Sequence, residues 1–262
     1  MRILITGAGR AIGAATAVEL TRAGHQVVAT ARDVAVLEGL DVALRLPMDV
    51  TDERSVSAAV DAAGALDAVV NNAAVSGKGP LEDYPIDRLR AIYETNTLGP
   101  LRVVQRVLPD WRRRGHGVVV NVSSVQGRVA TPLEGPYSSS KFALESLSET
   151  LRYEAGHFGI RVVLVEPGYT GPGMKAVADH PGDPAYTELW EQWRGTDAKV
   201  TGTAGRTAPE EVARAIRSAV EDGSTPFRVR VGVDADLVLS ARDAMDDGAF
   251  EAAMRQVTGM TW

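Results

Sequence analysis

The sequence contains no cysteine among its 262 residues. This absence excludes disulfide bonds, zinc sites built from thiolates, iron–sulfur clusters and a cysteine nucleophile. Histidine is also scarce: His25, His116, His157 and His180 stand far apart, and no two of them have the spacing of a metal-binding motif. We therefore expect no metal site, and any chemistry must depend on other side chains.

The chain also lacks a long apolar run and an excess of basic residues. Ile3 to Ile5 is too short to form the core of a signal peptide, and no segment approaches the roughly 18 apolar residues of a membrane span. The 34 acidic and 28 basic residues leave a net charge of −6, which argues against a large nucleic-acid footprint. These features predict a cytoplasmic protein with no nucleic-acid partner and no membrane partner.

Short β-branched runs alternate with amphipathic helical segments along the chain. The predicted strands are Ile3–Thr6, Gln26–Ala31, Ala43–Leu46, Ala68–Asn71, Val118–Val122, Arg161–Val165 and Phe227–Val231. The predicted helices between them are Ile12–Ala23, Ser55–Ala63, Ile86–Arg113, Ser138–Gly156 and Pro209–Glu221. This alternation predicts one α/β domain over residues 1–262, with about seven strands in a parallel sheet that is covered by helices on both faces.

Residues 171–206 interrupt the alternation and are too long for an ordinary loop. An insertion after the sixth strand, at the carboxyl edge of the sheet, is where open α/β folds place substrate-binding elements. The aromatic and apolar residues of the insertion predict a lid over the active site, or alternatively they fill the core or contact another subunit. The residues concerned are Met174, Tyr186, Leu189, Trp190 and Trp193. The apolar end of the chain, 260–262, covers the substrate cleft or packs on a partner subunit. A lid of this kind indicates a bulky hydrophobic or aromatic ketone or secondary alcohol as substrate.

A glycine-rich turn follows the first predicted strand and precedes a helix. Gly7, Gly9 and Gly13 have the spacing G-x-G-x-x-x-G, which differs from a strict G-x-G-x-x-G and from a P-loop. In this context glycines let the backbone approach a pyrophosphate, whose charge is met by free amides and by the helix dipole. The alternative is a tight turn with a structural role only.

The end of the second predicted strand bears on which nicotinamide cofactor is bound. An acidic side chain at that place accepts a hydrogen bond from the adenosine 2′-hydroxyl of NAD. Here Arg32 occupies the position, and together with Arg10 of the glycine turn it predicts a clamp for the 2′-phosphate of NADP. NAD becomes possible if Asp33, rather than Arg32, points at the ribose.

Tyr137 and Lys141 lie four residues apart at the start of a predicted helix. This spacing places the phenol and the ammonium on one face of the helix, about 5–6 Å apart at Cβ. The alternative is a solvated lysine that lies near a core tyrosine.

The motifs together resemble the classical short-chain dehydrogenase/reductase family over about the first 170 residues. The resemblance rests on the order and spacing of these motifs: Thr6-Gly7-x-x-x-Ala11-x-Gly13, Asp49-Val50, Asn71-Asn72-Ala73-Ala74, Asn96, Ser124, Tyr137-x-x-x-Lys141 and Pro167-Gly168. It implies a Rossmann-like doubly wound sheet. It also implies a homodimer or homotetramer, as is common among members of the family.

The resemblance implies four catalytic residues: Asn96, Ser124, Tyr137 and Lys141. Tyr137 is the general acid or base, and the Lys141 ammonium favours its phenolate. Ser124 donates a hydrogen bond to the substrate oxygen, and Asn96 anchors a water that relays protons to Lys141. Read alone, Ser124 is also consistent with an ordinary strand-end hydroxyl, and Asn96 with a residue beside a helix kink at Gly99-Pro100.

The same resemblance implies an extended cofactor site in which Asp49 contacts the adenine. The residues it assigns to the cofactor are Gly7, Gly9, Arg10, Ala11, Ile12, Gly13, Arg32, Asp49, Val50, Asn72, Ala73, Ala74, Tyr137, Lys141, Pro167, Gly168 and Thr170. Lys141 also bonds the nicotinamide ribose, and Asn71 braces the central strands.

Three residues depart from the family pattern. Ala11 replaces a glycine, and its methyl group can crowd the cofactor. Ala74 also replaces a glycine, which matters only if that position needs a positive φ. Pro172 stands where a threonine commonly meets the nicotinamide carboxamide, and Thr170 is the candidate substitute.

The function implied is that of an NADP(H)-dependent oxidoreductase, a ketoreductase or alcohol dehydrogenase acting on a small-molecule carbonyl or alcohol. Two alternatives stay open. One is an epimerase, isomerase or cyclase that uses the same Tyr137–Lys141 pair without net redox change. The other is a non-catalytic regulator that binds NADP, for which the four catalytic residues would not be needed. A hydrolase is disfavoured because the chain has no Gly-x-Ser-x-Gly motif.

Overall fold

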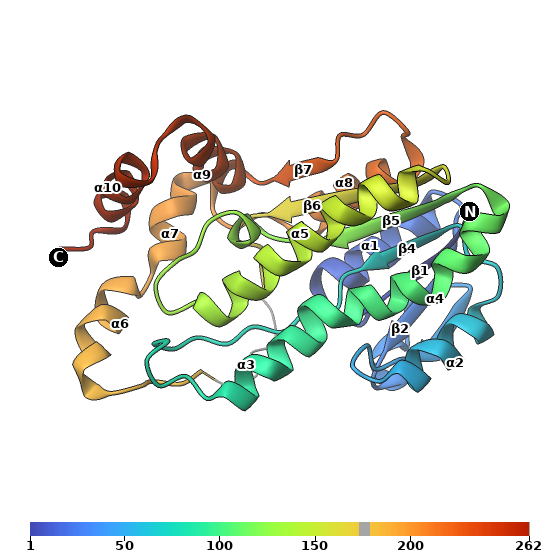
Figure 1. The fold of residues 1–262 in the computed structure, drawn as a ribbon, viewed down its shortest axis with the longest axis horizontal. Helices are drawn as coiled ribbons and strands as arrows, with labels where there is room; N and C mark the ends of the chain where they lie inside the picture. Colours follow the sequence, from blue (N-terminus) through green and yellow to red (C-terminus); the bar gives the residue numbers. More distant parts are fainter. Residues whose placement is uncertain (173–178, 262) are drawn as a thin grey trace.

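The computed structural model describes residues 1–172 and 179–261. Its strands are β1 (Arg2–Ile5), β2 (Gln26–Ala31), β3 (Leu44–Pro47), β4 (Ala68–Asn71), β5 (Gly117–Val122), β6 (Ile160–Pro167) and β7 (Arg228–Val231). They form one parallel sheet in the order β3-β2-β1-β4-β5-β6-β7 (Figure 1). The predicted fold class is confirmed. Because β2 and β4 flank β1 on opposite sides, the chain changes direction across the sheet at β1, where open α/β sheets bind ligands.

The helices alternate with the strands up to β7 and then continue without further strands in the described part of the chain. They are α1 (Ala11–Arg22), α2 (Glu53–Ala63), α3 (Ile86–Tyr93), α4 (Gly99–Arg114), α5 (Gly135–Gly156), α6 (Thr187–Trp193), α7 (Thr196–Thr201), α8 (Pro209–Glu221), α9 (Val233–Ala244) and α10 (Asp247–Thr258). None of the helices in the described residues is long and apolar enough to cross a membrane.

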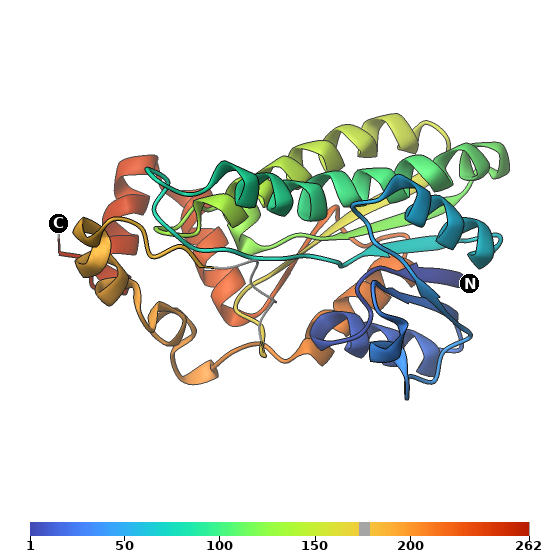
Figure 2. The same cartoon turned by 90° about the horizontal axis from the view of Figure 1, so that it is seen from below.

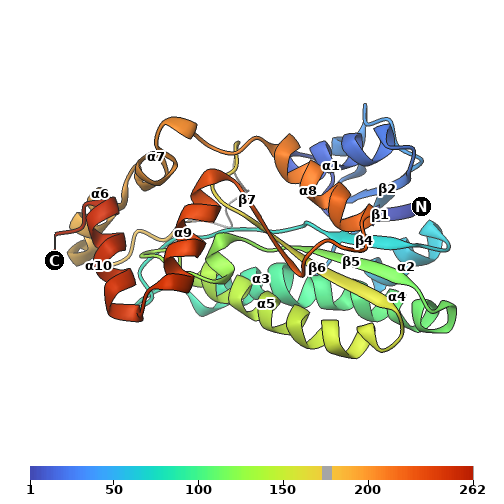
Figure 3. The same cartoon turned by 90° about the horizontal axis from the view of Figure 1, so that it is seen from above.

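The sheet buries both of its faces because successive side chains along each strand point to opposite sides. Ile3 and Ile5 pack with α1 and α8 in one apolar core, whereas Leu4 between them packs with α2, α4 and α5 in another. Figures 2 and 3 show the two helical layers on opposite sides of the sheet. The strands therefore read as nearly continuous apolar runs in the sequence.

The helix predicted over 86–113 is divided by a π-helical segment, η2 (Glu94–Leu98), between α3 and α4. Inserted π turns are often found at functional sites, and this one contains Asn96, which is wholly buried. Thr97 of the same segment donates a hydrogen bond from Oγ1 to the backbone oxygen of Ser140 at 2.9 Å. The π segment thus fixes the start of α4 against α5.

Helices α6, α7, α9 and α10 lie beyond the carboxyl ends of the strands (Figure 1). A small apolar core joins three of them to the 3-10 turn η3 (Val125–Gly127), with Val129, Val238, Leu239 and Phe250 buried at its centre. The segment predicted as a substrate-binding insertion contributes α6 and α7 to this region. These helices therefore lie at the edge of the sheet at which the parallel strands end.

Candidate active site

A cavity of about 790 Å³ runs along the carboxyl ends of the strands. One end lies over the glycine turn after β1, the middle lies against β4, β5 and α5, and the other end reaches α7, α9 and α10. The volume is in the range of small-molecule and cofactor sites. The elements that line it are those to which the sequence assigns cofactor and catalytic residues.

The glycine turn is held in shape by the turn that follows β4. Thr6 Oγ1 accepts hydrogen bonds from the backbone N–H groups of Asn72 and Ala73, both at 3.0 Å. The Asn72 side chain in turn donates from Nδ2 to the backbone oxygens of Thr6 and Gly7 at 3.0 Å. Gly7 has φ +66°, and a Cβ there would lie 2.9 Å from Ala73 Cα, so only glycine fits. The Asn72-Ala73 pair therefore shapes the turn as well as lining the cavity.

The other glycines of the motif have different roles. A Cβ on Gly9 would meet Val36 Cγ2 at 2.4 Å, and Gly9 lines the cavity. Gly13 does not line it; a Cβ there would lie 2.3 Å from the backbone oxygen of Gly7. Gly13 thus lets α1 pack closely against the turn. Ala11 lines the cavity with φ +45°, a conformation that favours glycine, whereas Ala74 is not at positive φ.

Two arginines flank the end of the cavity that lies over the glycine turn. Arg10 and Arg32 both line it, and neither forms an ion pair with any residue in 1–172 or 179–261. Asp33, the residue that could reverse the cofactor preference, also lines the cavity, and its Oδ1 caps the 3-10 turn η1 (Val34–Leu37) by accepting from Ala35 N at 3.0 Å. All three charged side chains therefore stand at this end of the cavity, with one oxygen of Asp33 bonded to the backbone of η1.

The third strand adds a polar edge to the same end. Asp49 and Val50 line the cavity with Met48. The Asp49 carboxylate is oriented by Thr51, whose backbone N–H and hydroxyl donate to Asp49 Oδ1 at 2.9 and 2.8 Å. Asp49 is therefore fixed beside an apolar wall that suits a planar base.

The middle of the cavity brings together Ser124, Tyr137 and Lys141. Tyr137 lies in the first turn of α5, and Ser124 lies at the start of η3, where its Oγ accepts from Gln126 N at 3.1 Å. Lys141 is buried one turn after Tyr137, with Nζ 5.8 Å from the centre of the Tyr137 ring and donating to the Val122 backbone oxygen at 2.8 Å. The three side chains form one constellation on adjacent elements.

Burial has the largest effect on the pKa values of both Tyr137 and Lys141. It raises the pKa of Tyr137, the hydrogen bond with Ser124 lowers it, and the negative charge of Glu134 raises it further. The sequence predicts that the Lys141 ammonium favours the phenolate, whereas here that ammonium is directed at a backbone carbonyl and Ser124 is the group that lowers the pKa. Burial also lowers the pKa of Lys141 to about 8, which the charge of Glu145 opposes.

Asn96 does not line the cavity. Its side chain is bonded to Val75 on both sides, accepting from the backbone N–H and donating to the backbone oxygen, each at 2.9 Å. It also donates to Ser140 Oγ at 3.0 Å. Asn96 thus ties the loop after β4 to α5 just behind Tyr137 and Lys141.

Pro167 at the end of β6, and Gly168 and Thr170 after it, line the cavity. Pro172 is not among the lining residues, whereas Thr170 is, and the role of Thr170 as a substitute stays a prediction. Asn71 does brace the central strands, donating from Nδ2 to Asn121 Oδ1 at 2.8 Å. The positions assigned to the cofactor by motif therefore meet in one cavity, with Gly13 behind it.

The insertion contributes only part of the expected aromatic lid. Trp193 is buried and lines the cavity, but Trp190 points away and donates from Nε1 to the Pro181 oxygen at 2.8 Å. Tyr186 donates to Glu82 at 2.6 Å on the exterior, and Leu189 is outside the lining as well. Met174 and Trp262 lie outside the described residues. The apolar wall is completed by Val129, Val200, Val238 and Met254.

A sequence model of the family described as short chain dehydrogenase matches residues 1–181. The chain belongs to the short-chain dehydrogenase family. It is 31% identical to the 3-ketodihydrosphingosine reductase of Bacteroides thetaiotaomicron, over 97% of this chain and 96% of that protein. The predicted resemblance is confirmed, and it assigns the protein to a family of oxidoreductases.

Two solved structures share the fold of this short-chain dehydrogenase. A short-chain dehydrogenase from Streptomyces avermitilis has a TM-score of 0.82 and 34% identity, over 98% of this chain and 94% of that chain. A short chain dehydrogenase from Burkholderia cenocepacia in complex with NADP has a TM-score of 0.77 and 26% identity, over 97% of this chain and 96% of that chain. The likeness extends beyond the motif-bearing part into the carboxyl-terminal helices.

Several polar residues line the cavity of this short-chain dehydrogenase without belonging to any of the sequence motifs. Tyr169, next to Gly168, lines the cavity, and burial followed by nearby acidic groups raises its pKa. Lys78 and Glu134 line it as an ion pair. The one available signal was local: Glu134 precedes Tyr137 by three residues, so it must lie near the phenol at the start of the helix.

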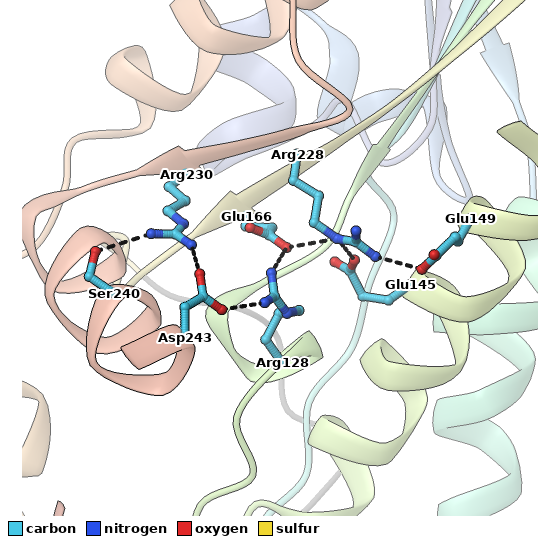
Figure 4. A network of polar contacts seen from close by, with 8 residues as sticks. All are labelled: Arg128, Glu145, Glu149, Glu166, Arg228, Arg230, Ser240 and Asp243. Carbon is cyan, nitrogen blue, oxygen red and sulfur yellow. Dashed lines mark hydrogen bonds and ion pairs between the residues drawn. The ribbon is translucent and has the colours of Figure 1, made fainter. Parts of the chain in front are cut away.

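A network of charged side chains connects β6, β7 and α5 with α9 (Figure 4). Glu166 at the end of β6 is wholly buried between Arg128, which follows η3, and Arg228 of β7. Arg128 also pairs with Asp243 of α9 at 2.7 Å, and Arg228 pairs with Glu145 of α5 at 3.0 Å. Within residues 1–172 and 179–261, no three acidic or histidine side chains gather into a metal site.

Proposed function

We propose that the protein is an NADP(H)-dependent oxidoreductase that interconverts a ketone and a secondary alcohol on a bulky, largely hydrophobic substrate. The observation that carries this proposal is one continuous cavity. Ser124, Tyr137 and Lys141 lie at its middle, a glycine turn with two arginines lies at one end, and an apolar wall lies at the other.

The first part of the cavity fits a dinucleotide. Its glycines leave room that a Cβ would fill, and the backbone of the turn stands at the start of α1, where the helix dipole favours a pyrophosphate. Arg10 and Arg32 are placed to bind a 2′-phosphate, which only NADP carries. The NADP complex of the Burkholderia relative supports this choice. When bound, NADP(H) supplies or accepts the hydride.

The chain's own residues then handle the substrate oxygen and its proton. In reduction, the Tyr137 hydroxyl donates its proton to that oxygen, and Ser124 donates a hydrogen bond to it as negative charge develops. Lys141 holds a buried positive charge beside them, and Asn96 keeps the loop after β4 in place behind α5. In oxidation, the same phenol acts as the base.

The apolar end of the cavity supports a hydrophobic substrate. Val129, Val200, Val238, Met254 and Trp193 come from five different segments and face the same space as Tyr137. A relative named as a reductase of 3-ketodihydrosphingosine supports a ketone as the group that is reduced.

The direct test follows the loss of NADPH absorbance when purified protein is mixed with a panel of ketones. We expect oxidation of NADPH with a secondary alcohol as product. In Tyr137→Phe, kcat should fall by roughly a hundredfold to ten-thousandfold, as expected for loss of a general acid. Tyr153→Phe is the matched control, because Tyr153 lies on the same helix and is 75% exposed. Turnover that survives in Tyr137→Phe, or a product of unchanged oxidation state, would refute the proposal.

A further inference from the structure

An ion pair between a buried glutamate and a partly exposed lysine stands in the wall of the cavity beside α5. Lys78 Nζ lies 2.6 Å from Glu134 Oε1, and both residues line the cavity. Glu134 is 6% exposed, whereas the Lys78 side chain is 40% exposed. The family's catalytic positions do not include either residue, so the pair needs a separate explanation.

The pair is held by groups from several parts of the chain. Glu134 Oε2 accepts hydrogen bonds from the side chains of Gln126 and Thr131. The backbone N–H of Lys78 donates to Asp179 Oδ1 at 3.1 Å. A lysine normally keeps its ammonium in water on a flexible stem, whereas here the ammonium is paired with a buried carboxylate that Gln126 and Thr131 hold in place.

The position of the pair relates it directly to the reacting group. Glu134 immediately precedes α5 and lies three residues before Tyr137, and Gln126 lies two residues after Ser124. Glu134, Ser124 and Tyr137 all line the same cavity. A substrate whose carbonyl meets Ser124 and Tyr137 therefore has Lys78 and Glu134 in the wall of the same cavity.

The charges of Lys78 and Glu134 determine which chemical groups of a substrate the pair can bind. An ammonium has three N–H donors, and Glu134 occupies one of them. A carboxylate on the substrate would be repelled by Glu134 and an ammonium by Lys78. A neutral hydroxyl group meets neither repulsion, because it accepts a hydrogen bond from Lys78 and donates one to Glu134.

We infer that Lys78 and Glu134 form a subsite for a neutral hydroxyl group on the substrate, close to the reacting carbonyl. The rest of the substrate lies against the apolar wall at Val129, Val238 and Met254. This inference rests on the proposed function and narrows its substrate class to amphiphilic hydroxyketones and the corresponding diols.

The test compares ketones of one chain length in the presence of NADPH: 2-decanone, 1-hydroxy-2-decanone, 4-hydroxy-2-decanone and 4-oxodecanoate. We expect at least one hydroxyketone to exceed 2-decanone by about tenfold in kcat/KM, because a site built for a hydroxyl discriminates against the analogue without one. The keto acid should be the poorest of the four. In Lys78→Met, the ratio of hydroxyketone to plain ketone should fall to about one.

Arg90→Met is the matched control, because it removes an exposed cation of α3 that does not line the cavity. It should keep the full preference. Equal kcat/KM values for hydroxylated and plain ketones in the natural protein, or a preference that persists in Lys78→Met, would overturn the subsite. Thermal unfolding of Lys78→Met verifies that the variant is folded.

Binding to the NADPH complex, followed by NADPH fluorescence, gives the same comparison without turnover. If no ketone is reduced, the proposed function fails, while the subsite is still judged by whether hydroxyketones bind more tightly than 2-decanone. If ketones are reduced but the hydroxyl gives no advantage in rate or binding, the subsite alone fails.

Discussion

The Glu166 carboxylate lies 3.7 Å from the Arg128 guanidinium without a hydrogen bond to it, at a position that solvent does not reach (Figure 4). The nearest nitrogen of Arg228 is 3.5 Å from the Glu166 carboxylate, and neither Glu166 oxygen accepts a hydrogen bond. Burial, reinforced by the charge of Glu145, raises the pKa of Glu166 to about 7, although Arg128, Arg228 and Arg230 oppose the shift. A carboxyl group therefore titrates near neutral pH directly before Pro167 and Gly168 of the cavity.

We expect Glu166 to make the protein less stable as pH rises. The folded state holds its proton up to about pH 7, whereas the unfolded chain releases it near 4.5. The folded state therefore binds more protons in this interval, and the free energy of unfolding falls as pH rises through it. A shift of this size corresponds to about 3 kcal/mol.

Glu166→Gln imitates the protonated form and should remove most of that pH dependence. Urea unfolding at about pH 5 and about pH 8 should show a variant that gains roughly 2–3 kcal/mol relative to the natural protein at the higher pH. Glu149→Gln removes an exposed partner of Arg228 on the same network and should leave the slope unchanged. An equal pH slope in Glu166→Gln and the natural protein would show that Glu166 is ionised throughout.

Ala11 is expected to limit the stability of the cofactor turn. Its φ of +45° costs an alanine roughly 1–2 kcal/mol, part of which glycine recovers. Ala11→Gly should therefore raise the free energy of unfolding by about 1 kcal/mol and tighten NADPH binding. Ala14→Gly, in the regular part of α1, should have the opposite effect and cost about 1 kcal/mol. Destabilisation by both substitutions would mean that Ala11 is not strained.

Arg32 is expected to determine the preference for NADPH over NADH. Loss of its charge-assisted bond to a 2′-phosphate should weaken NADPH binding by roughly tenfold to a hundredfold in Arg32→Ala. NADH lacks this phosphate, so its affinity should stay the same. Fluorescence titration with each cofactor measures both, and Arg22→Ala, which lies outside the cavity, controls for the loss of one positive charge. A parallel loss for both cofactors would contradict the assignment.

The sheet and the catalytic centre could be predicted because each depends on short sequence patterns. The strands are apolar on both faces, and Tyr137 and Lys141 lie on one helix, so neighbours in the sequence determine the result. Helix α9 was not predicted for a physical reason: its Asp234 is buried and accepts from Tyr169 N at 2.6 Å, whereas Val233 and Leu237 are 66% and 57% exposed. Because Val238 and Leu239 of the same helix are buried while these two apolar residues are exposed, the apolar residues lie on both sides of α9 and give no clear periodic signal.

The substrate side of the cavity could not be predicted either, because its residues are brought together only by the tertiary structure. Lys78 and Glu134 meet only because the loop after β4 passes beside the start of α5. Trp190 and Trp193 are three residues apart on α6, and helical spacing alone assigns them to one face. In the structure Trp190 is held by the Pro181 carbonyl, so only Trp193 of this pair reaches the cavity.

This difference between the two tryptophans leads to a matched pair of substitutions. Trp193→Leu removes apolar surface from the cavity wall, so KM for a bulky aromatic ketone should rise by about tenfold relative to KM for a small ketone. Trp190→Leu makes the same chemical change on the same helix outside the cavity and should leave that ratio unchanged. Steady-state kinetics with the two ketones measure the ratio in each variant. If both substitutions alter it equally, or neither does, Trp193 is a packing residue and the substrate lies elsewhere along the wall.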